Sequence, residues 1–107
     1  MKYRVVLVEA AECDLLDLHL FVELNDSPDR ADILLEHIEQ AINTLSQMVQ
    51  RGHYPPELAR LGIHDFREIH YPPYRIIYEI IGKEIIVHAV VDGRRDLRDL
   101  LAVRLLH

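Results

Sequence analysis

The residues most able to do chemistry in this 107-residue sequence are arginines of its second half. Four of them gather around a turn and the segment that follows it: Arg94, Arg95, Arg98 and Arg104. Such a cluster is typical of a local site for phosphate or another anion. Asp96 and Asp99 lie between these arginines and offer the alternative, in which helical ion pairs neutralise the cluster.

Two further arginines lie in strand-like segments. Arg75 lies in a segment whose side chains alternate between two faces of a strand, and it shares its face with Ile77. Instead of a functional role, it could have a structural one, as a cross-strand ion pair with Glu68 or Glu79. For Arg67 a structural salt bridge is the favoured interpretation.

Histidine and cysteine side chains are further candidates, as metal ligands and as nucleophiles. His64, Glu68 and His70 share one face of a regular strand, but the two histidines would lie roughly 20 Å apart along it. One ion cannot bind both, so we expect no metal and no cofactor. His88 is expected to be a hydrogen-bonded core residue, and Cys13 a small buried residue without a catalytic role.

The net charge of −6 is unevenly distributed. Residues 1–53 hold 4 Lys/Arg and 10 Asp/Glu, whereas residues 54–107 hold 8 of each. An acidic chain repels phosphate, which argues against general nucleic-acid binding. One cysteine, no signal-peptide pattern and no membrane-length apolar run predict a cytoplasmic protein.

Hydrophobic periodicity predicts the elements that position these residues. The second helix should begin at Ser27-Pro28, run for about 22 residues and end at a Gly52 cap, forming an antiparallel hairpin with the first. Phe21, Leu24 and Leu106 are possible spare apolar surface for a partner. We expect strands at 3–8, 65–70, 74–81 and 84–91, long helices at 10–25 and from 28, a single helical turn at 56–60, and a last helix at 96–106.

The order β-α-α-β-β-β-α predicts one α+β domain over residues 1–107. In it the helical hairpin packs on one face of a small, mostly antiparallel sheet. Gly82-Lys83 should form a two-residue II′ turn between two of the strands.

Three segments of the second half, with the strand and helices of the first half, resemble the RelE/ParE toxin family over nearly the whole chain. The segments are Phe66-Arg67-Glu68-Ile69-His70, Pro73-Tyr74-Arg75-Ile76-Ile77-Tyr78 and Val90-Val91-Asp92-Gly93-Arg94-Arg95-Asp96. The resemblance implies a growth-inhibiting toxin of a bacterial type II toxin–antitoxin system. It also implies a cognate antitoxin partner, encoded by the adjacent gene, and a toxin–antitoxin hetero-oligomer.

The family contains two kinds of toxin. RelE-like members are ribosome-dependent, metal-independent mRNA endonucleases (mRNA interferases), and ParE-like members bind DNA gyrase. In the nuclease alternative the resemblance makes Arg75 and Arg95 the catalytic residues that hold the scissile phosphate, assisted by Arg67 or His70. Arg94 and Arg98 join Arg67 as candidate nucleic-acid or target-binding residues.

The departures from RelE favour the ParE-like alternative. Phe66 and Glu68 stand where RelE has lysines, and Leu101 aligns near its catalytic tyrosine. Other nuclease relatives use a Glu and a C-terminal His, for which Glu57 and His107 are the candidates, although the sequence does not place them near Arg75. The sequence therefore predicts a toxin that acts on a protein such as DNA gyrase. An mRNA endonuclease is the alternative, and a non-toxic relative that keeps the fold is the third possibility.

Overall fold

The computed structural model describes residues 2–94 and 97–105. A four-stranded sheet has the order β1-β4-β3-β2, in which β1 pairs parallel with β4 and the other neighbours are antiparallel. The elements are β1 (Arg4–Leu7), α1 (Glu9–Asn25), α2 (Pro28–Asn43), a 3-10 turn (Thr44–Ser46), α3 (Pro56–Ala59), β2 (Phe66–Tyr71), β3 (Tyr74–Ile81), β4 (Glu84–Asp92) and α4 (Arg98–Leu105). The predicted α+β class and element order are confirmed. None of the described helices is long and apolar enough to cross a membrane.

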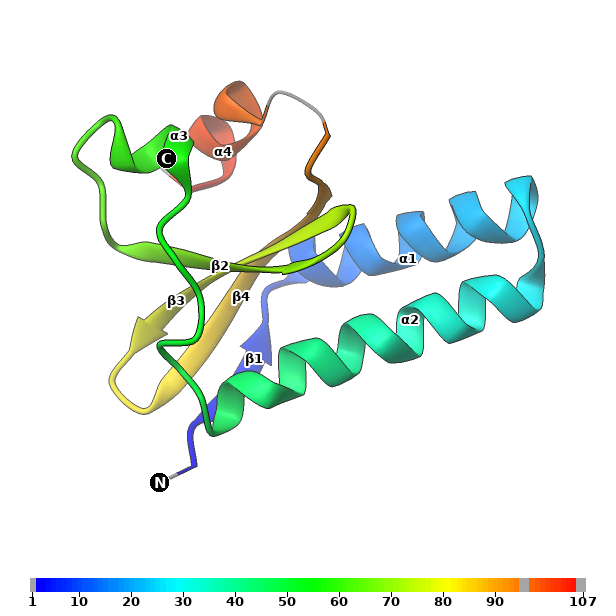
Figure 1. The fold of residues 1–107 in the computed structure, drawn as a ribbon, viewed down its shortest axis with the longest axis horizontal. Helices are drawn as coiled ribbons and strands as arrows, with labels where there is room; N and C mark the ends of the chain where they lie inside the picture. Colours follow the sequence, from blue (N-terminus) through cyan, green and yellow to red (C-terminus); the bar gives the residue numbers. More distant parts are fainter. Residues whose placement is uncertain (1, 95–96, 106–107) are drawn as a thin grey trace.

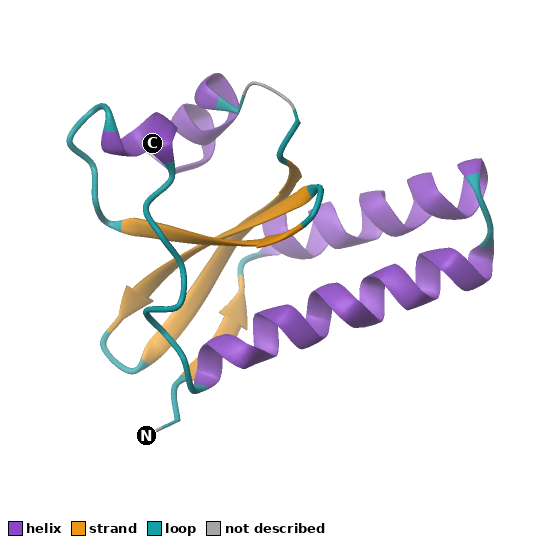
Figure 2. Ribbon diagram, in the orientation of Figure 1, coloured by secondary structure: helices purple, strands orange, loops and turns teal. Residues whose placement is uncertain are grey.

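Helices cover both faces of this sheet (Figure 1). The α1–α2 hairpin packs on one face, where Ala11 and Ile38 meet Ile76 and Tyr78 of β3. On the other face, α3 and α4 cover a second apolar cluster (Figure 2), built from Leu58, Phe66, Ile77, Ala89, Val91, Leu97 and Leu101. The sequence predicted only the first of these layers, because α3 is a single turn and α4 is short.

Local signals predicted the start of α2 correctly and its end wrongly. The Ser27 Oγ accepts a hydrogen bond from the Arg30 backbone N–H at 3.1 Å, and Pro28 occupies the first turn. The helix ends at Asn43, far short of Gly52. A 3-10 turn follows, which buries Leu45 and lets the Ser46 carbonyl accept from the Tyr3 N–H at 2.7 Å. Packing beside β1 therefore ends the helix.

Gly52 serves close packing and not a helix cap. Gly52 does not have the positive φ that a left-handed helix cap requires. Positive φ values occur at Gly62 and at Gly82, where φ is +59° in the predicted two-residue turn. A Cβ at Gly52 would lie 2.5 Å from the Glu68 carbonyl oxygen and 2.7 Å from the Tyr78 hydroxyl oxygen. The Gly52 N–H donates to that hydroxyl at 3.1 Å, and the hydroxyl donates to the Val49 carbonyl at 2.7 Å. The loop can lie this close to β2 only because residue 52 has no side chain.

Gly52→Ala should therefore lower the free energy of unfolding by about 2 kcal/mol, because backbone atoms of β2 must move. Urea denaturation measures the change. Gly62→Ala is the control, since its Cβ would meet nothing within 4 Å and only its φ of +78° is unfavourable, at roughly 1 kcal/mol. Equal losses in the two variants would contradict the close-packing explanation.

Candidate functional site around Arg75

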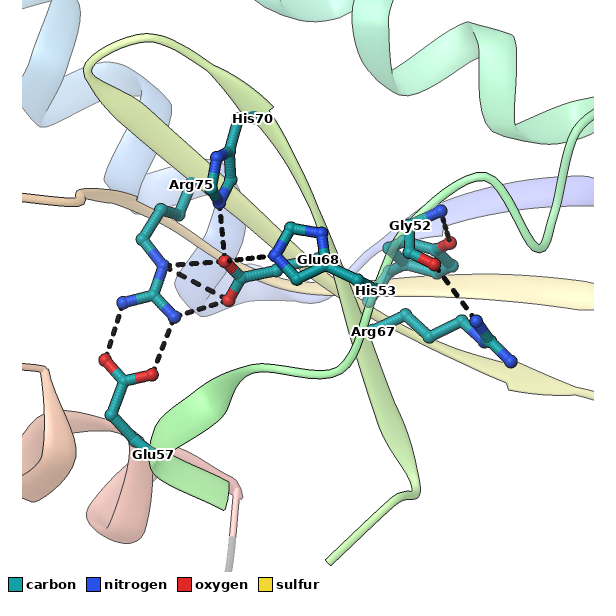
Figure 3. Close-up of polar contacts among 8 residues, drawn as sticks. Gly52, His53, Glu57, Arg67, Glu68, His70 and Arg75 are labelled. Atoms are coloured by element: carbon teal, nitrogen blue, oxygen red, sulfur yellow. Dashed lines mark hydrogen bonds and ion pairs between the residues drawn. The ribbon is translucent and has the colours of Figure 1, made fainter. Parts of the chain in front are cut away.

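The candidate site is a polar cluster on the α3–α4 face of the sheet (Figure 3). Arg75 comes from β3 and Glu68 and His70 from β2, while Glu57 comes from α3 and His53 from the loop before it. His70 is the direct cross-strand partner of Arg75, and Glu68 lies two residues before it on the same face. The register of β2 against β3 thus brings these side chains together.

Two carboxylates surround the Arg75 guanidinium. Its Nη1 and Nη2 donate to Glu57 Oε2 and Oε1 at 2.6 and 2.7 Å. Its Nε lies 3.1 Å from both Glu68 oxygens, and Nη2 also donates to Glu68 Oε2. Arg75 is only 8% exposed and Glu68 only 1%. The structural alternative for Arg75, a pair with Glu68, is correct, and the second partner is Glu57 instead of Glu79.

The cluster shifts the pKa values of its charged groups. Hydrogen bonding to Glu57, and then to Glu68, raises the pKa of Arg75 above its usual value, although burial opposes this shift. The same bond from Arg75 lowers the pKa of the Glu57 carboxyl below its usual 4.5. Both groups are therefore charged at neutral pH, and each holds the other in place.

A family-wide sequence profile described as "ParE toxin of type II toxin-antitoxin system, parDE" matches residues 5–97. The chain belongs to the ParE toxin family. It is therefore a ParE-type toxin of a type II toxin–antitoxin system.

Solved structures agree with this ParE-family fold. The chromosomal ParDE system of P. aeruginosa superposes with a TM-score of 0.72 at 17% identity, covering 85% of this chain and 96% of that one. The RelBE2 toxin–antitoxin complex of Mycobacterium tuberculosis gives 0.59 at 23% identity, covering 86% and 99%. A search of curated proteins finds no match.

Within this ParE-family toxin, the positions that depart from RelE are buried. Phe66 and Leu101 belong to the apolar cluster on the α3–α4 face, and Glu68 is bound to Arg75. The structure does place Glu57 beside Arg75, which the sequence could not do because 18 residues separate them. His107 lies outside the described residues.

Three of the other sequence-predicted arginines, all within the described residues, have partners away from Arg75. Arg67 forms no ion pair among the described residues; it donates to the Gly52 carbonyl at 3.0 Å and lies over the Tyr54 ring. Arg94 donates to Asp92 within its own turn. Arg104 pairs with Asp14 of α1 at 2.7 Å, so the alternative of pairing within its own helix does not hold for it. Arg98 lines a shallow pocket with Glu57 and Arg60, and Arg95 and Asp96 lie outside the described residues.

Two expectations about isolated side chains have opposite outcomes. Cys13 is exposed, so its predicted burial is wrong: α1 turns that position away from the sheet. His88 is hydrogen-bonded as predicted, with Nε2 2.9 Å from Glu79 Oε1, although it is only partly buried.

The Glu57–Arg75 pair predicts a pH-dependent stability. In the folded protein the pKa of Glu57 is below 4.5, its value in the unfolded chain. The contribution of Glu57 to the free energy of unfolding is therefore complete above pH 4.5 and is lost as the pH falls through the pKa of the folded state. Glu57→Gln should therefore have a lower free energy of unfolding than the wild type at neutral pH, and this difference should become smaller in acid. Urea denaturation across this range measures it, with exposed Glu39→Gln as control. A difference in the free energy of unfolding that does not change with pH would exclude an ionic contribution of Glu57 to stability.

Proposed function

We propose that this ParE-family toxin acts in the cytoplasm on a protein target such as DNA gyrase, and that it does not cleave mRNA. The observation that carries the proposal is the pairing of Arg75 with two carboxylates. Every guanidinium nitrogen of Arg75 already donates to Glu57 or Glu68. A phosphate would have to displace a bidentate carboxylate from a largely buried cation, and the other carboxylate would still repel it.

The surroundings of Arg75 support the same proposal. Phe66 and Glu68 align with lysines of RelE and Leu101 lies near the position of its catalytic tyrosine, and all three are buried here. The net charge of −6 adds long-range repulsion of RNA. A ParE-like action needs only a surface complementary to a protein, and the acidic bias does not hinder it.

A metal-independent mRNA endonuclease is the second candidate, and one observation favours it. Glu57, His70 and Arg75 meet at one place, which is the set of residue types that a general acid, a general base and a phosphate-binding group require. His70 Nε2 lies 2.6 Å from Glu68 Oε1, so Glu68 could orient the ring. Phosphate binding would require Glu57 to leave Arg75.

A variant that removes the ionic cluster distinguishes the two candidates. In Glu57→Gln/Glu68→Gln/Arg75→Met the three charges are lost together, which avoids leaving one buried charge unpaired. Because the cluster also supports the fold, the comparison is made where circular dichroism shows the triple variant to be folded. There the proposed function predicts unchanged growth arrest and unchanged inhibition of purified gyrase in a supercoiling assay. A nuclease that uses Arg75 should lose about 100-fold or more in rate.

Mapping of mRNA 5′ ends after induction of the wild-type chain completes the test. Codon-positioned cleavage that disappears in the triple variant would overturn the gyrase proposal. Absence of growth arrest by the folded wild-type chain would favour the non-toxic relative. Circular dichroism of both proteins controls for folding.

The antitoxin, we further propose, covers the outer face of α1. Leu16, Leu20, Phe21 and Leu24 are exposed there, Phe21 at 63% and Leu24 at 74%. Phe21 also lines a groove with Tyr74 of β3 and Leu100 of α4, and Asp17 and Arg94 are among its charged lining residues. A groove lined by both apolar side chains and charges of both signs suits one amphipathic segment of an antitoxin. The toxin–antitoxin complexes among the similar structures support such a partner and a hetero-oligomer.

Phe21→Ser/Leu24→Ser should weaken the complex with the antitoxin encoded beside the toxin gene by roughly 30-fold, or about 2 kcal/mol, because an apolar anchor is lost. Isothermal titration calorimetry measures the change in Kd. Val103→Ser is the matched control, since Val103 is equally exposed but lies on α4. Stability of the toxin alone should change little in either variant. An unchanged Kd in the double variant would place the antitoxin elsewhere.

A further inference from the structure

Three side chains of the candidate site have a geometry that the proposed action on a protein target does not use. His53, Glu68 and His70 each offer one ligand atom, and these atoms lie within 4.8 Å of one another. Glu68 Oε1 is 3.3 Å from His53 Nε2 and 2.6 Å from His70 Nε2. Ligand atoms about 2.0–2.1 Å from a tetrahedral ion lie roughly 3.3 Å apart. The His53–Glu68 distance already has that value, whereas the His70 ring, now hydrogen-bonded to Glu68 at 2.6 Å, would have to move outward by a side-chain rotation to admit an ion.

The backbone fixes this arrangement. Glu68 and His70 are two residues apart on β2 and therefore point to the same face. His53 forms an antiparallel bridge with Glu68 through N–H···O bonds of 3.0 and 2.7 Å, which aligns its side chain with that of Glu68. The missing side chain of Gly52 permits this bridge. The His53 and His70 rings meet edge-on, with centroids 5.0 Å apart (Figure 3).

We propose that His53, Glu68 and His70 bind a divalent transition cation of the Zn²⁺ type. Two imidazoles and one carboxylate form a donor set that Zn²⁺, Co²⁺ and Cu²⁺ accept and that the oxygen-seeking Mg²⁺ and Ca²⁺ do not. The sequence led us to expect no metal, on the ground that His64 and His70 lie too far apart on one strand, and the proposal departs from that expectation. His64 is not part of the group, because it contacts the Tyr54 ring instead. A loop residue distant in sequence supplies the second imidazole.

Charge and support around the site favour cation binding. Glu57 and Glu68 carry two negative charges against the single positive charge of Arg75, so these three groups leave one net negative charge beside the imidazoles. Arg75 also holds the Glu68 carboxylate from behind, as supporting residues hold metal ligands. The ion would take the place of the proton between His70 and Glu68. The histidine side chains are 60% and 48% exposed, which gives an ion a direct path and leaves a coordination position open to water.

Titration of the untagged full-length chain with ZnCl₂ tests the proposal. We expect one equivalent bound at the site, and a visible absorption band of tetrahedral type when CoCl₂ replaces zinc. His53→Ala and His70→Ala should each weaken zinc binding by about 10-fold or more. His64→Ala should bind as the wild type does, because His64 is an exposed histidine of the same region outside the cluster. MgCl₂ at the same concentration should not compete.

A second measurement guards against effects on folding. Zinc should raise the melting temperature of the wild type and of His64→Ala, and should leave that of His53→Ala/His70→Ala unchanged. Absence of zinc binding by the folded wild type would overturn the proposal. Equal binding by the double variant would also overturn it, as would an equal loss in His64→Ala.

Discussion

The pairing of the buried Arg75 guanidinium with two carboxylates is the interaction on which the rest of this structure depends. An isolated charge at this depth would be strongly unfavourable, so both partners must be held within hydrogen-bonding distance. Glu68 is placed by the β2–β3 register, and Glu57 requires α3 to lie against the sheet. Gly93 is fixed by the same side chain, because a Cβ there would lie 2.8 Å from the stem of Arg75. The Arg75 side chain therefore constrains α3 and β2 through its charge, and the turn that carries Arg94 through its apolar stem.

The same pairing gives Arg75 a structural role in this ParE-family toxin. The Tyr-Arg strand that resembles a phosphate site carries an arginine already neutralised from within, and Arg104 is likewise paired with Asp14. For interaction with the antitoxin we propose the exposed leucines and Phe21 of α1. The far end of the α1–α2 hairpin projects beyond the sheet, where a partner can reach it (Figure 1).

Sequence reasoning succeeded where the signal was local. Ser27 and Pro28 mark the start of α2 through groups three residues apart, and Gly82 supplies the positive φ of the hairpin turn. The alternation of β3 placed Ile77 and Arg75 on one face and Ile76 and Tyr78 on the other, as found in the two apolar clusters. It failed at Gly52, whose role is to let a loop approach β2, and at the end of α2, which packing against β1 decides.

By itself, then, the sequence determined the order of the elements, the α+β class and the face on which Arg75 lies, because capping, turn geometry and side-chain periodicity act over a few residues. Only the tertiary structure decided the partners of that arginine and the gathering of His53, Glu68 and His70. Glu57 and His53 lie 18 and 15 residues before the groups they meet, across a loop. The physical reason is that a loop's path is set by the need to pair a buried charge and by the absence of a side chain at Gly52, and neither leaves a periodic mark in the sequence.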